Sequence, residues 1–120
     1  MEEDANLEEL KEKVDFGIKI WLEFEEKSIL GSGWANLLAC IDNNEINSLT
    51  EAAKECNYSY KYAWNILKRI EKRTGYSPVI TSKGGPGGGG FVKLNNWGKY
   101  LLERFRTLSE GIKNLESELK

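Results

Sequence analysis

The stretch Ser48–Arg73, SLTEAAKECNYSYKYAWNILKRIEKR, predicts two short helices joined by a tight turn. Ser48 and Glu51 have the spacing of a capping box at the start of the first helix. Asn57 tolerates the left-handed conformation that ends helices, and Ser59 is suited to cap the second helix. The small apolar residues of the first helix let the second helix cross it closely, as a helix-turn-helix requires. The buried stripe of the second helix is expected at i, i+4 and i+7, on Ala63, Leu67 and Ile70.

The other faces of the second helix carry side chains suited to DNA recognition. Such a helix leads with its N-terminus into the major groove, and an asparagine can pair bidentately with adenine. We expect base contacts from Tyr60, Lys61, Tyr62 and Asn65, and phosphate contacts from Lys54, Lys68, Lys83 and Lys93. Arg69 and Lys72 lie further along the helix, and Thr50 and Ser59 complete the expected DNA-binding positions outside the glycine loop. The alternative is a plain helical hairpin with a solvated basic face.

The charge distribution favours a nucleic-acid partner although the net charge of the 120 residues is −2. Residues 1–30 hold ten acids and four bases, residues 31–106 six acids and eleven bases, and residues 107–120 three acids and two bases. The segment with the helix-turn-helix is therefore basic by five charges. Contact with phosphates depends on a local basic surface, whatever the total.

Length and composition indicate one domain with helical arms. No run of about 20 apolar residues predicts a membrane span, and the acidic start MEEDANLEEL is unlike a secretory signal, so we expect a cytoplasmic protein. Cys40 and Cys56 are expected as buried thiols in a reducing compartment. With no histidine and two cysteines, no metal site is expected, and the sequence indicates no cofactor.

Upstream of the helix-turn-helix, the pattern predicts three elements. Residues 5–17 suggest a short amphipathic helix with an apolar stripe on Leu7, Leu10 and Val14. Residues 18–24, IKIWLEF, alternate with a period of two and predict a strand, after which Ile29 and Leu30 pair briefly. A helix is expected over 33–42, with its apolar face on Trp34, Leu37, Leu38 and Ile41.

A strand, a glycine-rich loop and a returning strand follow the second helix and predict a wing over residues 79–94. The loop holds six glycines in the seven residues Gly84–Gly90. A phosphate-binding loop of a nucleotide enzyme needs its lysine after the glycines and a helix next, and here Lys83 precedes them and a strand follows. A flexible linker is the plainer alternative. A third is close approach of side-chain-free backbone to DNA phosphates, which would involve Gly84, Gly85, Gly87 and Gly88.

The last helix is expected to start at Asn95 or Asn96 and to dimerise. From Leu101 its large apolar residues recur with spacings of 4, 3, 4, 3 and 4, which is a heptad seam. A helix with such a seam rarely stands alone in water, so a homodimer is the simplest explanation. The expected dimer contacts are Leu101, Phe105, Leu108, Ile112, Leu115 and Leu119, joined by the N-terminal stripe Leu7, Leu10 and Val14.

Three features occur together in this sequence: SLTEAAKECNYSYKYAWNIL, the loop SKGGPGGGG, and a strand leading into a helix opened by Trp97-Gly98. This set resembles the N-terminal winged-helix domain of ModE-type molybdate-responsive regulators, which is distantly related to the LysR-type DNA-binding domain. The upstream ILGSGWANLLACI also matches, and the resemblance covers about residues 18–110.

The resemblance implies a homodimeric transcription regulator with its recognition helices in successive major grooves. It also implies that Ser59, Tyr60 and Lys61 begin the recognition helix, that Trp64 anchors the core, and that Gly84–Gly90 lie in the wing. This sequence departs from the family at Asn57, where glycine is frequent, at Asn95, where threonine is usual, and in a return strand about one residue longer. Members also carry a C-terminal oxyanion-binding domain, and nothing in these 120 residues is assignable to it. A response to those oxyanions would therefore require a separate sensing protein.

These observations predict a mainly α protein with a small β wing, a winged helix-turn-helix with N- and C-terminal helical arms. The arms are residues 1–17 and 97–120, and the DNA-binding domain is residues 18–96, with the helix-turn-helix at 48–73. The expected function is sequence-specific binding of double-stranded DNA by a homodimeric transcription regulator, with no reaction catalysed. One alternative is a winged-helix module that binds another protein without reading DNA. The other is an enzyme that uses the glycine loop on a nucleotide.

Overall fold

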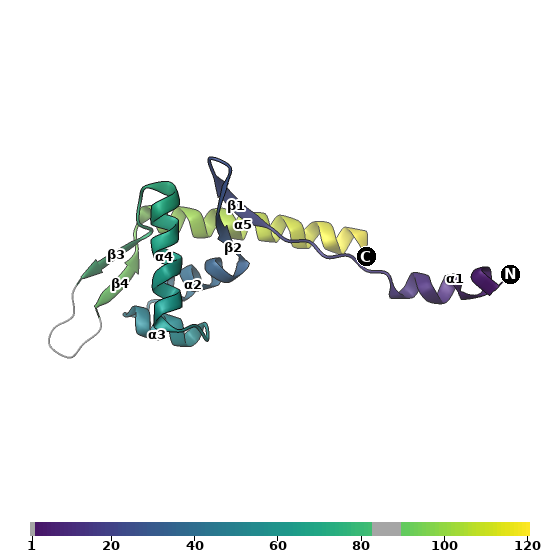
Figure 1. The fold of residues 1–120 in the computed structure, drawn as a ribbon, viewed down its shortest axis with the longest axis horizontal. Coiled ribbons are helices and arrows are strands. Elements are labelled where there is room, and N and C mark those ends of the chain that lie inside the picture. The colour runs from purple at the N-terminus through teal and green to yellow at the C-terminus, as the bar shows by residue number, and fades with distance from the viewer. Residues whose placement is uncertain (1, 83–89) are drawn as a thin grey trace.

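The computed structural model describes residues 2–82 and 90–120, which form an elongated molecule of about 75 × 30 × 23 Å (Figure 1). The chain is mainly α-helical, and its centre is a winged helix-turn-helix with a small β wing, as the sequence predicts. In chain order the elements are α1 (Glu2–Lys13), β1 (Trp21–Phe24), β2 (Lys27–Gly31), α2 (Ser32–Asp42), α3 (Leu49–Glu55), α4 (Tyr60–Thr74), β3 (Val79–Ser82), β4 (Phe91–Leu94) and α5 (Asn96–Leu119).

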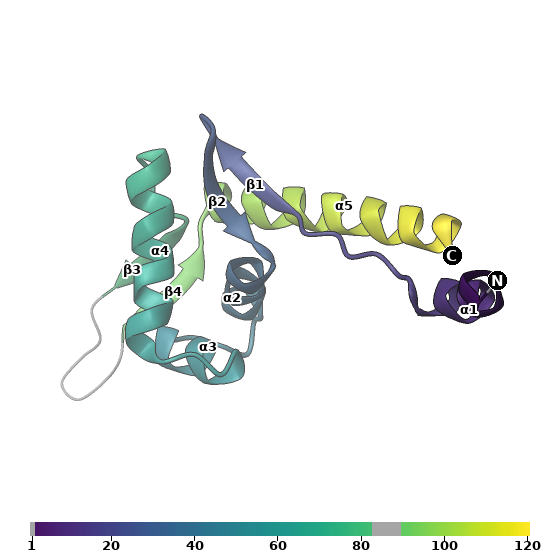
Figure 2. The same ribbon diagram turned by 45° about the vertical axis from the view of Figure 1, so that its right-hand side comes forward.

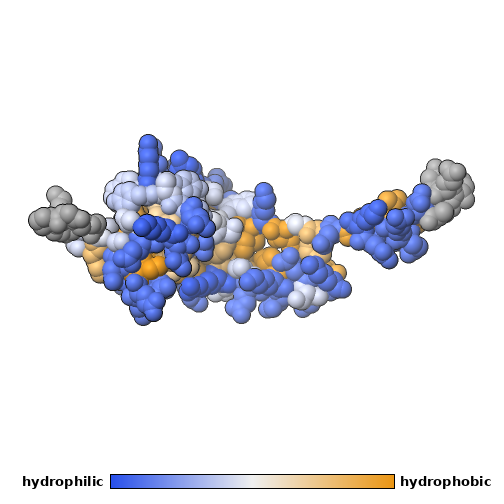
Figure 3. Space-filling view, turned by 90° about the horizontal axis from the view of Figure 1, so that it is seen from below, coloured by the Kyte–Doolittle hydropathy of each residue, from blue (hydrophilic) through white to orange (hydrophobic). Residues whose placement is uncertain are grey.

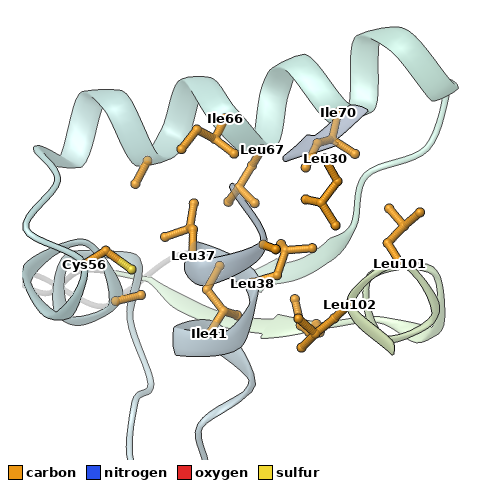
Figure 4. Close-up of a cluster of buried hydrophobic side chains, with 14 of the residues drawn as sticks. Leu30, Leu37, Leu38, Ile41, Cys56, Ile66, Leu67, Ile70, Leu101 and Leu102 are labelled. Atoms are coloured by element: carbon orange, nitrogen blue, oxygen red, sulfur yellow. The ribbon is translucent and has the colours of Figure 1, made fainter. Parts of the chain in front are cut away.

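The hydrophobic core surrounds α2. Leu37, Leu38 and Ile41 of α2 are fully buried, and Figure 4 shows them between the apolar side of α4 and the first turns of α5. Burial of each such side chain stabilises the fold by about 1.5–3 kcal/mol. The stripe expected on α4 is confirmed, and Ile66 joins it. The buried stripe of α4 is therefore Ala63, Ile66, Leu67 and Ile70.

The helix boundaries are set by the side chains that the sequence indicates. Ser48 Oγ accepts a hydrogen bond from the backbone N–H of Glu51 at 3.1 Å, and Ser59 Oγ accepts one from Tyr62 at 3.0 Å. Asn57, in the turn between α3 and α4, has the left-handed φ of 60°. Asn95 Oδ1 accepts from the backbone N–H of Gly98 at 2.8 Å and begins α5. These local predictions are confirmed.

β1 and β2 form an antiparallel hairpin that turns at Glu25 and Glu26, whose φ angles are 48° and 70°. The strand expected over 18–24 begins only at Trp21, so the prediction is wrong for residues 18–20. Trp21 pairs with Gly31, and α2 starts at the next residue, so β2 offers no partner to residues before Trp21. The alternation of apolar residues there does not reflect a strand.

The wing is the antiparallel pair β3–β4, in register from Val79 opposite Leu94 to Ser82 opposite Phe91. It is fastened to the start of the helix-turn-helix, because the N–H of Val92 donates to the carbonyl oxygen of Asn47 at 3.0 Å. An isolated bridge joins Ser48 to Phe91. The glycine loop predicted between the strands falls on residues 83–89 for the most part, which lie outside the described residues.

The first part of α5 packs in the core of the domain, and its last part is largely exposed to solvent. Leu101 and Phe105 are only 2% and 7% exposed and belong to this chain's own core, which corrects their assignment to a dimer seam. The heptad spacing does not distinguish packing within a chain from packing between chains. Beyond them Leu108 and Ile112 are half-buried, whereas Leu115 and Leu119 are 43% and 61% exposed on a helix that projects from the domain (Figure 1).

The N-terminal helix ends earlier than expected. α1 closes at Lys13, so Val14 lies outside it, and the helix predicted over 5–17 is wrong at its C-terminal end. Leu7, Leu10 and Val14 are all exposed. In Figures 1 and 2 α1 stands at the far end of the molecule from the wing.

The two cysteines lie side by side, with their sulfur atoms 3.0 Å apart, and both are free thiols. Cys56 is buried as expected, but Cys40 is partly exposed. Burial, together with the hydrogen bond to Cys40, raises the pKa of the Cys56 thiol to about 12. Cys56 therefore stays protonated in the folded protein well above neutral pH.

A glycine-to-alanine pair on α5 tests how closely the wing and α5 pack. A Cβ at Gly98 would lie well inside 3.0 Å of the backbone carbonyl oxygen of Pro78, whereas one at Gly111 would meet nothing within 4 Å. Gly98→Ala should lower the free energy of unfolding by about 3 kcal/mol through overpacking. Gly111→Ala should raise it by about 0.5–1 kcal/mol through helix propensity. Urea denaturation measures both, and equal stabilities would contradict the close approach.

Candidate nucleic-acid interface

The solvent side of α4 presents a polar stripe opposite the buried one. Lys61, Asn65, Lys68 and Lys72 are all exposed and are spaced by 4, 3 and 4 residues. At 3.6 residues per turn these positions fall within about 60° of one another. The burial of α4 thus aligns three cations and an amide, the groups that contact phosphates and base edges, along one side of the helix. These four residues are called the α4 stripe below.

The N-terminus of α4 is open to an anion. Its first turn contains no acidic residue, and Tyr60 and Lys61 are exposed there. Free backbone N–H groups and the positive end of the helix dipole favour phosphate at such a site. Tyr62 is also exposed, but its ring packs edge-on against the ring of Tyr58, with the two ring centroids 5.0 Å apart. The Tyr58 hydroxyl in turn donates to the carbonyl oxygen of Gly33 at 3.0 Å, so Tyr62 lies on the side of α4 next to α2.

Trp64 is not a core residue. It is 37% exposed, and the ammonium of Lys68 lies 4.7 Å from the centroid of its ring. Trp64 follows Ala63 directly, so its side chain points about 100° around the helix from Ala63 and away from the buried stripe. Ile66 fills the core position that the resemblance assigned to Trp64. Lys68 Nζ also lies 3.3 Å from Glu71 Oε1, an exposed pair whose stabilisation is about 0–1 kcal/mol. Such a pair is readily exchanged for a phosphate.

The remaining expected contacts have different surroundings. Thr50 and Lys54 are exposed and share a face of α3, and Ser59 is exposed at the turn before α4. Lys93 is half-buried, and its Nζ donates to the carbonyl oxygen of Ile46 at 2.8 Å. That bond fastens the wing to the residues before α3 and competes with the phosphate contact expected of Lys93. The others, Lys83, Gly84, Gly85, Gly87 and Gly88, lie outside the described residues.

The fold gathers the positions on α3 and in the first turn of α4 at one end of the domain. In Figures 1 and 2 the outer end of the wing, α3 and the N-terminus of α4 lie together, while the C-terminus of α4 lies beside the β1–β2 hairpin. The described residues that the sequence predicts to bind DNA thus lie mainly on α3 and α4, with the wing alongside.

The structure adds two basic residues that the sequence pattern did not assign to DNA. Lys27 begins β2 and Arg73 lies in the last turn of α4, and both lie beside Arg69 and Lys72. The Arg69 guanidinium stands over the ring of Trp34 at 5.9 Å. No local motif signals this grouping, because Lys27 is more than forty positions upstream and reaches α4 only through the fold.

Other kinds of site find little support in the described parts of the chain. Among residues 6–82 and 90–120, whose side chains the structure describes, no group of three metal-ligating side chains could bind a metal ion. Within the same residues, no helix has both the length and the apolar composition to cross a membrane.

Comparison with known proteins gives one kind of match. The chain is 32% identical over 63 residues to the DNA-binding transcriptional dual regulator ModE of Escherichia coli K12 and to the transcriptional regulator ModE of Shigella flexneri. The matched region is 52% of this chain and 24% of each regulator, so the chain corresponds to about a quarter of the length of these relatives. No protein-family model matches the sequence.

Proposed function

We propose that this chain binds double-stranded DNA in a sequence-specific manner and regulates transcription as a homodimer. The α4 stripe carries the proposal, because a recognition helix needs exposed base-reading and phosphate-binding groups on one side. In this role Lys61, Asn65 and Tyr60 contact base edges, with Tyr62 at their margin. Phosphates are held by basic side chains and by exposed hydroxyl groups. The basic residues are Lys54, Lys68, Arg69 and Lys72, and the hydroxyl groups are those of Thr50 and Ser59. Similarity to the ModE regulators supports this assignment over an unrelated helical hairpin.

A second copy of this chain is the proposed partner for the projecting half of α5. Leu108, Ile112, Leu115 and Leu119 continue the heptad spacing on one side, and the last two are exposed in the described chain. Figure 3 shows apolar surface gathered along the middle of the molecule, between the wing-bearing body and α1. Leu101 and Phe105 are buried in the core of their own chain, so they are not part of the proposed dimer surface.

The N-terminal arm fits the same interface. α1 has twelve residues, and an isolated helix of that length is marginal in water. Its exposed Leu7 and Leu10, with Val14 just beyond, supply apolar contacts that the described chain leaves unused. In this proposal residues 18–96 bind DNA, and residues 97–120 and 1–17 dimerise.

The salt dependence of binding tests the proposal most directly. If each protomer contacts several phosphates, log K should fall linearly with log salt, with a slope of about −0.9 per phosphate contact. Affinity for duplex DNA should then drop by orders of magnitude between about 50 and 200 mM salt. Fluorescence anisotropy with labelled duplexes measures this. A flat titration, or no binding at low salt, would favour the protein-interaction alternative.

Lys61→Ala separates base reading from phosphate contact. On a site selected from random duplexes the loss should be about 1–3 kcal/mol of binding free energy if Lys61 pairs with a base. On random DNA the loss should be much smaller. Lys68→Ala is the matched control, because a phosphate contact weakens both complexes alike. Equal losses on both duplexes for Lys61→Ala would make Lys61 a phosphate contact too.

A pair of charge-matched variants tests the dimer. Leu115→Glu with Leu119→Glu places two carboxylates on the proposed seam and should give monomers by light scattering. Asn114→Glu with Ser117→Glu adds the same charge on the opposite side of α5 and should stay dimeric. The last fully buried residue of α5 is Phe105, so neither pair of substitutions alters a residue of the domain core. A two-fold dimer should also select an inverted repeat with half-sites about 10 bp or a multiple apart. Seam variants that remain dimeric would overturn this arrangement.

A further inference from the structure

A hollow at the C-terminal end of α4 is lined entirely by basic side chains. Lys27 enters it from β2, and Arg69, Lys72 and Arg73 enter it from α4. The hollow encloses about 490 Å³ and opens to solvent. Its four residues come from two elements that meet only in the folded chain, so the cluster is a product of the tertiary structure and not of a basic run in the sequence. They are called the basic hollow below.

The two arginines of the basic hollow are held in place without an acidic partner. Arg73 donates a hydrogen bond to the carbonyl oxygen of Ser28, and the Arg69 guanidinium stands over the Trp34 ring. Both partners are neutral. The ion pairs in the described residues are those of Lys11, Lys13 and Lys68, and none involves the hollow. Glu71, the acid on the same turns of α4, is the partner of Lys68.

The helix dipole explains only part of this arrangement. Basic residues in the last turn of a helix are favoured by the negative end of the dipole, which accounts for Lys72 and Arg73. It does not account for Lys27, which comes from the hairpin, or for the neutral contacts that orient both arginines. Like charges held together repel one another, and a bound anion removes that repulsion. Two oriented guanidinium groups with two ammonium groups match the oxygens of a phosphate.

We propose that the basic hollow binds a phosphate group of the DNA backbone on the strand that flanks the groove occupied by the N-terminal half of α4. This inference rests on the proposed DNA binding. Eleven residues separate Lys61 from Lys72, which is about 16 Å along the helix axis. The major groove is only about 12 Å wide, so the end of a helix whose N-terminus reads bases extends over the backbone. Lys72 belongs to both the α4 stripe and the basic hollow, so it links the proposed contacts in the groove to the proposed contact with the backbone phosphate.

Lys27→Gln tests the proposal, because it removes a charge from the hollow without touching α4 or its buried stripe. The proposed homodimer has two hollows, so the slope of log K against log salt should become shallower by about 1.8, which is about 0.9 for each protomer. A fourfold rise in salt then weakens binding about 12-fold less than in the unaltered protein. The change should be equal on the selected site and on random duplexes, because a phosphate contact carries no sequence information.

Lys19→Gln is the matched control, since this exposed lysine lies before β1 and outside the hollow. Its slope should equal that of the unaltered protein, and circular dichroism melting should show both variants folded. If the unaltered protein binds DNA and Lys27→Gln keeps its slope, the hollow is not a backbone site, while the proposed function stands. If the unaltered protein fails to bind DNA at low salt, the proposed function fails and this inference fails with it.

A second arm distinguishes backbone phosphate from a free oxyanion. The unaltered protein and Lys27→Gln are titrated with inorganic phosphate at constant ionic strength, followed by the NMR signals of the arginine side chains. Backbone binding predicts no saturable response to inorganic phosphate together with the altered DNA slope. Saturable binding that is lost in Lys27→Gln, with an unchanged DNA slope, would assign the hollow to a free oxyanion and overturn the proposal.

Discussion

The rotation of α4 about its own axis is the constraint on which the rest of the surface depends. Ala63, Ile66, Leu67 and Ile70 bury one side of the helix against α2 and β2 (Figure 4). A shift of one residue in that stripe would turn every other side chain by about 100°. The same burial that stabilises the core therefore aims the α4 stripe at solvent. An uninterrupted apolar stripe is what gives the recognition surface a single orientation.

The wing depends on the helix-turn-helix in a similar way. β4 is joined to the residues before α3 by the Val92–Asn47 hydrogen bond and by the Lys93 ammonium on the Ile46 carbonyl. On the other side, Gly98 lets α5 approach the Pro78 carbonyl, and Asn95 Nδ2 donates to the carbonyl oxygen of Ser77 at 2.7 Å. The wing thus takes its position from both α3 and α5. Lys93 shows the consequence, because a lysine expected to hold DNA instead fastens the wing to the residues before α3.

What the sequence predicts correctly is what short-range chemistry decides. The caps at Ser48, Ser59 and Asn95 and the left-handed Asn57 follow from side chains within three residues of the atoms they satisfy. The errors arise where one periodic pattern has two possible partners. Leu101 and Phe105 fit a heptad seam and equally fit a core, and only the packing of α5 on α2 separates the two. Trp64 was placed in the core by resemblance, and Lys27 reaches α4 only after the β1–β2 hairpin forms.

The separation of charge along the molecule resolves the conflict between an acidic chain and a DNA partner. The described acids of α1, Glu8, Glu9 and Glu12, lie at the opposite end of a molecule 75 Å long from the wing. At 0.1 M salt, exposed charges further apart than about 10 Å are largely screened from one another. The α4 stripe and the basic hollow therefore act on a nearby phosphate without opposition from α1. The net charge of −2 thus says little about affinity, because a phosphate responds to the charges within its own screening length.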